Sequence, residues 1–72
     1  MISKDEVIEN SNDRELVLKA IEETPTLIEF ASDALRDDKE LMLDAIKRNG
    51  EVLEFASDRL KDDKDVILKA VK

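Results

Sequence analysis

The sequence predicts a small all-α protein built from short tandem helix pairs of about 25 residues, which pack into an α-solenoid-like array. The composition favours helix over strand, because 43% of the residues are charged and 42% hydrophobic, with one Gly, one Pro and no Tyr or Trp. The apolar residues follow a helical spacing, and the chain repeats itself at an offset of about 25 residues.

The internal repeat divides the chain. Residues 13–37 and 38–62 align without a gap, with about half of the positions identical, and are called here the first and second unit. Residues 63–72 align with the start of a third unit and are called the half unit, whereas residues 1–12 lie outside the repeat. Because 72 residues allow only one small core, we expect a single domain over residues 1–72, with 1–12 as an atypical capping helix.

Capping residues mark the predicted helix starts. Ser3 and Glu6 form the capping-box pattern S-x-x-E ahead of residues 7–8. In the units and the half unit, the equivalent N-caps are expected at Asn12, Asp37 and Asp62, each followed three residues later by an acid. The run Leu-Met-Leu at 41–43 is also compatible with a buried strand, but its flanks do not alternate, so helix is the better interpretation.

The second helix of each unit is expected to begin at Thr24-Pro25 or Asn49-Gly50 after a turn of one or two residues, because Thr and Asn are N-cap types and Pro is tolerated at the first helical position. Asn-Gly is a strand-hairpin signal elsewhere, but the flanking periodicity is helical. Helices of about ten residues do not persist alone in water, so they must support one another.

Several residues in the second half of the unit have structural interpretations. Leu35 and Leu60 stand among charged neighbours, and we expect each to fold back as an apolar plug under the next helix. The equivalent Ser32 and Ser57 are expected to cap the short turn that follows them. The two aromatic residues, at equivalent apolar positions, are expected in the core; they are Phe30 and Phe55.

No pattern in the sequence predicts catalysis, a metal or a cofactor. The pairs Asp37-Asp38 and Asp62-Asp63 suggest calcium, but the calcium-loop motif is absent and one member of each pair is assigned to a helix cap. There is no His to activate Ser32 or Ser57, and no Cys for a thiolate site. We therefore expect a protein that is not an enzyme, with no catalytic, cofactor-binding or metal-ligating residues.

The net charge of −7 argues against nucleic acid and anionic membranes as partners, because the basic residues are interleaved with acids. The N-terminus lacks the apolar segment of a signal peptide, and no run of about 18 apolar residues occurs. A soluble, cytoplasmic protein is the expectation, and the lack of cysteine fits a reducing compartment.

Residues 35–57 and 60–71 resemble the repeat family catalogued as domain of unknown function 4116. Residues 35–57 carry the whole of its phrase, L-x-x-D-K-[ED]-x-[VM]-L-x-A-[VI]-x-x-[ND]-G-x-x-L-x-[FY]-A-S, and residues 60–71 carry its start. The phrase also recurs in the first unit, with Thr24-Pro25 replacing Asn-Gly. The resemblance covers residues 13–72. It implies a helical array and supplies no established activity and no site residues.

The expected function is a non-catalytic protein-interaction module, because open-ended helical arrays leave a broad face for partners. The partner is expected to be a protein or peptide, with a basic segment favoured by the acidic charge. The alternative is a structural spacer, or an isolated or engineered fragment of an array, without a ligand of its own. A monomer is the default, although the half unit leaves Val66, Ile67 or Val71 partly uncovered, which favours weak end-to-end association.

Overall fold

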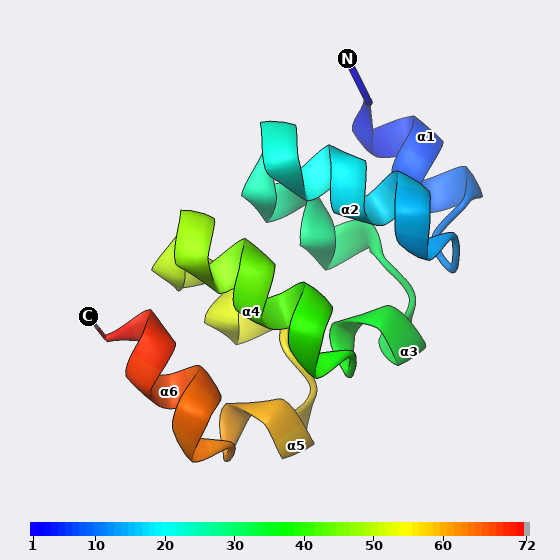
Figure 1. The fold of residues 1–72 in the computed structure, drawn as a ribbon. Coiled ribbons are helices and arrows are strands. Elements are labelled where there is room, and N and C mark those ends of the chain that lie inside the picture. Colours follow the sequence, from blue (N-terminus) through cyan, green and yellow to red (C-terminus); the bar gives the residue numbers. More distant parts are fainter. Residues whose placement is uncertain (72) are drawn as a thin grey trace.

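The computed structural model describes residues 1–71, and every regular element there is helical (Figure 1). Two of the elements are 3₁₀ helices and are labelled η. In chain order the elements are α1 (Lys4–Glu9), α2 (Arg14–Glu23), η1 (Pro25–Phe30), α3 (Asp33–Arg36), α4 (Lys39–Arg48), η2 (Gly50–Phe55), α5 (Asp58–Lys61) and α6 (Lys64–Ala70). From α2 onward, the helix starts recur at the same offset as the sequence repeat.

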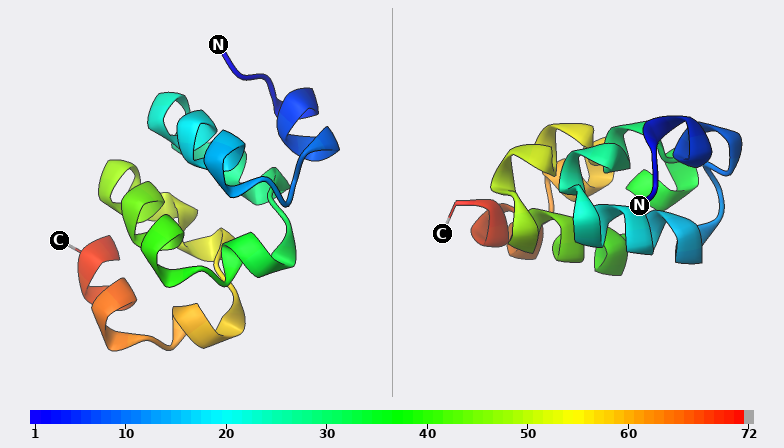
Figure 2. Two further views of the ribbon diagram at one scale, coloured as in Figure 1. Left: turned by 45° about the vertical axis from the view of Figure 1, so that its right-hand side comes forward. Right: turned by 90° about the horizontal axis from the view of Figure 1, so that it is seen from above.

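The helices form two layers (Figure 2). One layer consists of α2, α4 and α6 side by side, and the other of α1, η1 and η2. The single-turn helices α3 and α5 connect the layers along one edge, and α1 and α6 lie at opposite ends of the molecule (Figure 1). The overall dimensions are 31 × 20 × 16 Å.

The core fills the space between the layers, and no buried side chain of the described residues is polar. Leu35 and Leu60 are buried in it, as the sequence predicts, whereas Phe30 and Phe55 pack against it and stay half-buried. The buried residues are Val7, Val17, Ala20, Ile21, Ile28, Ala31, Leu35, Leu41, Met42, Ala45, Ile46, Val52, Ala56, Leu60 and Val66.

The predicted N-caps of the long helices are wrong by one residue. Ser3 caps α1 as expected, but α2, α4 and α6 are capped by Asp13, Asp38 and Asp63, whose carboxylates accept hydrogen bonds from backbone N–H groups of the first turn. Asp37 instead ends α3, with φ −98° and ψ 4°, whereas Asp38 has the extended backbone that an N-cap requires. Two adjacent aspartates therefore have different tasks.

The second helix of each unit is also shorter than predicted. It begins where expected, after Thr24 or Asn49, but it is a six-residue 3₁₀ helix. The backbone turns extended at the following Ala-Ser pair, because Ser32 and Ser57 cap further short helices, α3 and α5, by accepting bonds from the N–H groups of Leu35 and Leu60. Six residues is long for a 3₁₀ helix, since runs beyond three or four are uncommon, but it is short beside the helix of about ten residues that the sequence predicts. The predicted helix pair is thus a set of three elements.

Gly50 lets η2 approach α6 closely. A Cβ atom at this position would lie 2.8 Å from the backbone carbonyl oxygen of Ala70. The backbone of Gly50 has no positive φ, so the glycine is needed for space rather than for conformational freedom.

Candidate functional site

Polar contacts connect equivalent edges of successive units. The hydroxyl of Ser32 donates to the side-chain oxygen of Asn12 at 2.8 Å, and the equivalent Ser57 of the second unit donates to Asp37 at 2.5 Å. Beside each contact, the serine N–H donates to a backbone carbonyl, that of Ser11 at 2.8 Å or Arg36 at 3.1 Å. Asn12 and Asp37, which the sequence assigns to helix caps, therefore link the N-terminal segment to the first unit and the first unit to the second, respectively.

Asp37 has the densest set of partners in this network. Its carboxylate accepts from Ser57 and, at 2.9 Å, from Nε of Arg59, whose Nη2 also donates to the Asp37 carbonyl at 2.7 Å. The hydrogen bond from Ser57 and then that from Arg59 lower the pKa of the Asp37 carboxyl below its ordinary value. Asp37 is consequently ionised at neutral pH and a weak base.

A second network joins the starts of the long helices. Nε of Arg14 lies 2.8 Å from Asp38, and its Nη2 lies 3.3 Å from Glu40. Lys39 is equivalently placed 3.1 Å from each of the acids at positions 63 and 65. The hydrogen bond from Arg14 lowers the pKa of Asp38, and that from Lys39 lowers the pKa of Asp63. Such exposed pairs contribute little stability individually, but their repetition fixes how one unit meets the next.

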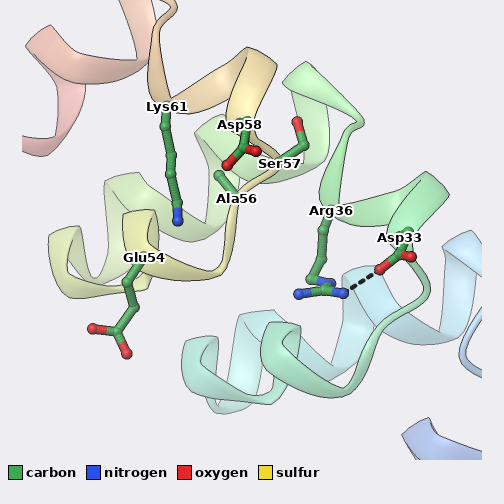
Figure 3. Close-up of a pocket in the computed structure, with 7 residues that line it drawn as sticks. All are labelled: Asp33, Arg36, Glu54, Ala56, Ser57, Asp58 and Lys61. Carbon is green, nitrogen blue, oxygen red and sulfur yellow. Dashed lines mark hydrogen bonds and ion pairs between the residues drawn. The ribbon is translucent and has the colours of Figure 1, made fainter.

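A polar hollow of about 340 Å³ lies between α3, η2 and α5 (Figure 3). Arg36 and Lys61 approach it from opposite sides, and Arg36 forms an ion pair with Asp33. Nε of Arg36 is buried without a hydrogen-bond partner among the described residues. The remaining lining residues are Glu54, Ala56, Ser57 and Asp58. Because its cations and carboxylates are intermixed, the hollow has no strong preference for an anion or a cation.

A larger groove of about 500 Å³ runs between α4 and α6, and we call it the leucine groove. Leu43 and Leu68 line it together with Asp65 and Lys69. Leu68 is 59% exposed, and Leu43 is half-buried. The same position in α2 is occupied by Leu18, also half-buried, so each long helix presents one leucine at the same register.

The residues that the sequence singled out for possible chemistry do not converge. Within residues 1–71, no group of three or more carboxylates is placed to hold a metal ion. Asp37 and Asp38 have different partners, and the hydroxyl of Ser57 donates to Asp37 while accepting from the Leu60 N–H. Sequence reasoning missed the leucine groove, although leucine recurs at 18, 43 and 68. Among the described residues, no helix is long and apolar enough to span a membrane.

Comparison with known proteins identifies one family. No curated protein and no solved structure matches the chain. The family model described as Domain of unknown function (DUF4116) matches twice, over residues 13–57 and over residues 38–72, so that the two matches begin at equivalent positions of the first and second unit. Together they span all of the chain from residue 13 onward, and the protein therefore belongs to the DUF4116 family.

Proposed function

We propose that this protein is a non-catalytic interaction module, an α-solenoid-like array of short helical repeats that binds a protein or peptide segment through the leucine groove. The observation that carries the proposal is the groove itself, which Leu43 and Leu68 line from neighbouring helices, with Leu68 exposed and Leu43 half-buried. An apolar surface at one register of successive helices is typical of helical arrays that bind extended or helical segments.

Charge favours a basic partner. One turn before each leucine, the long helices carry an exposed acid, at Glu15, Glu40 and Asp65 in turn. Glu40 and Asp65 each pair with a cation of the preceding long helix, but each of these cations is shared with a second acid, so the row stays negative. Residues three apart on a helix share a face, so the carboxylate row runs alongside the leucine row. Seven of the nineteen acids form ion pairs within residues 1–71, and the net charge is −7. An amphipathic segment with apolar anchors flanked by Lys or Arg complements this face.

The serine chemistry also supports a non-catalytic role. The Ser57 hydroxyl is committed to two hydrogen bonds, and its acceptor Asp37 has a lowered pKa, which weakens it as a general base. The carboxylates that line the polar hollow beside it, at 33, 54 and 58, belong to exposed residues and share the hollow with cations, so no apolar enclosure surrounds them. These residues therefore favour a binding surface over a catalytic site.

An amide NMR titration tests the proposal. The probe is a synthetic amphipathic helix with a leucine stripe flanked by lysines, and the control peptide carries glutamates in place of the lysines. The expected result is a set of shifts centred on Leu43, Asp65 and Leu68 with the basic peptide only. Since burying one leucine contributes about 1.5–3 kcal/mol, Leu68→Glu should weaken binding roughly tenfold or more.

Ile8→Glu is the matched control, because Ile8 is an exposed aliphatic residue, 49% accessible, at the opposite end of the molecule. It should leave peptide affinity unchanged. Binding that is equal for both peptides, or equal in Leu68→Glu and the parent, would reject the groove as the site. A spectrum that neither peptide perturbs would favour the alternative, a structural spacer without a ligand.

A further inference from the structure

Each of the three long helices carries an equivalent stripe of three residues on one face. In α2 and α4 this stripe lies at the junction with the next unit, whereas in α6 it is open. In α2 the stripe consists of Arg14, Val17 and Ile21, at positions i, i+3 and i+7 on one helix face. Both apolar members are fully buried, and the arginine forms ion pairs with the start of α4. This stripe is the tail face of the first unit.

The second unit repeats this arrangement with different residues. Met42 and Ile46 of α4 are 0% and 2% exposed, and Lys39 forms ion pairs with Asp63 and Asp65 at the start of α6. The junction therefore needs an aliphatic pair and a cation on one side, and two first-turn acids on the other. It tolerates Arg or Lys as the cation.

In α6 the same stripe is open within the described part of the chain. Ile67 is 38% exposed and Val71 69% exposed, although both equivalents in α2 and in α4 are buried. Lys64 takes the place of Arg14 and Lys39, and none of the ion pairs found within residues 1–71 involves it. Helix α6 thus carries an intact tail face.

The complementary face lies at the other end of the same molecule. The start of α2 has Asp13 and Glu15, equivalent to the acids that accept from Arg14 and Lys39, and both are exposed. Leu16 is only half-buried, whereas its equivalent Leu41 is fully buried. Helix α1 packs more on η1 than on α2, and it leaves these three residues, which we call the head face, exposed or half-buried, whereas Ala20 further along α2 is fully buried and the N–H of Ile2 donates to Glu23.

We propose that a second copy of this chain docks head to tail on α6, so that Lys64 of one copy pairs with Asp13 and Glu15 of the next and covers Ile67 and Val71. The contact is heterologous, and it leaves a free head and a free tail, so association is open-ended rather than limited to a dimer. It reuses the geometry of the two internal junctions. It uses residues other than the two leucines of the leucine groove, although Leu68 is a neighbour of Lys64 and Val71 on the surface of α6.

The test is sedimentation velocity of the intact chain over a concentration series of roughly 10 µM to 1 mM. The average mass should rise with concentration, and higher salt should weaken the association because the ion pairs are exposed. Lys64→Glu and Glu15→Lys should each remain monomeric, since each places like charges at the junction. Lys47→Glu, a charge change on an exposed residue outside both faces, should associate like the parent.

Mixing the two junction variants gives the decisive result. In the equimolar mixture, the unchanged tail of Glu15→Lys meets the unchanged head of Lys64→Glu and restores the parent junction, whereas a junction between like chains brings like charges together. The mixture should therefore recover association. Far-UV circular dichroism checks that each variant is folded. The proposal is overturned if the parent stays monomeric throughout, if the mixture fails to recover, or if Leu68→Glu abolishes association while the junction variants do not.

Discussion

Gly50→Ala tests whether the close approach of η2 and α6 is a real constraint. The added Cβ would lie 2.8 Å from the carbonyl oxygen of Ala70, a backbone atom that cannot move without shifting α6. Overpacking of this kind costs about 1–3 kcal/mol, and the loss of chain freedom in the unfolded state offsets about 0.4–1 kcal/mol. The expected net loss is about 1–2 kcal/mol, which in a domain of this size lowers Tm by roughly 5–15 °C.

Thermal and urea denaturation followed by circular dichroism measure this loss. The matched control is Thr26→Ala, an exposed position near the start of η1, for which a change within about 0.5 kcal/mol is expected. Amide NMR should place the largest shifts of the Gly50→Ala variant at Ala70 and its neighbours. A variant that melts at or above the Tm of the parent, with α6 amides unchanged, would refute the packing argument.

Three further predictions concern the core, the caps and pH. Leu60→Ala should cost about 2–5 kcal/mol in urea denaturation because Leu60 is fully buried, whereas the exposed Leu68→Ala should change stability by less than about 0.5 kcal/mol; equal effects would contradict the burial of Leu60. Asp63→Ala should lower Tm by several degrees because it removes the N-cap of α6, and Asp62→Ala should leave Tm unchanged. A larger loss for Asp62→Ala would show that Asp62 is the cap, as the sequence predicts. The pKa of Asp37 is lowered on folding, so its contribution to stability is complete above the ordinary value of 3.8 and is lost as pH falls through the lower folded pKa. Asp37→Asn should therefore lose less stability on acidification than the parent, and parallel pH profiles would count against this linkage.

Local signals made much of the fold predictable. The helix starts at Ser3 and Asn49 depend on side chains that accept hydrogen bonds within a few residues, and the start after Thr24 is marked by Pro25; sequence reasoning placed all three correctly. The choice between Asp37 and Asp38 was not predictable in this way, because both are good capping residues. That choice is decided by partners far along the chain, Ser57 for one aspartate and Arg14 for the other.

The leucine groove shows a different limit. The runs of three apolar residues at 16–18, 41–43 and 66–68 identify the long helices but do not say which member faces outward. Successive residues on a helix are about 100° apart, so three in a row cannot share one buried face. Which residue of each run is buried and which is exposed is decided only by the packing of neighbouring helices.

The first two positions of each run serve the two junctions of a unit. Leu41 and Val66 occupy the first position and are fully buried, whereas Leu16, with no unit before it, is half-buried. Met42 occupies the second position and is fully buried, whereas Ile67, with no described unit packed on it, is exposed. The first position therefore depends on the preceding unit, and the second on the following one.

The third position differs from the first two, because it is fully buried in none of the three long helices. Leu18 and Leu43 stay half-buried inside the molecule, and Leu68 is exposed at its end. A residue needed only for packing between units would be covered in the second unit, as Leu41 and Met42 are. A leucine that no junction buries completely supports placing the proposed partner at the third residue of the run rather than at either junction.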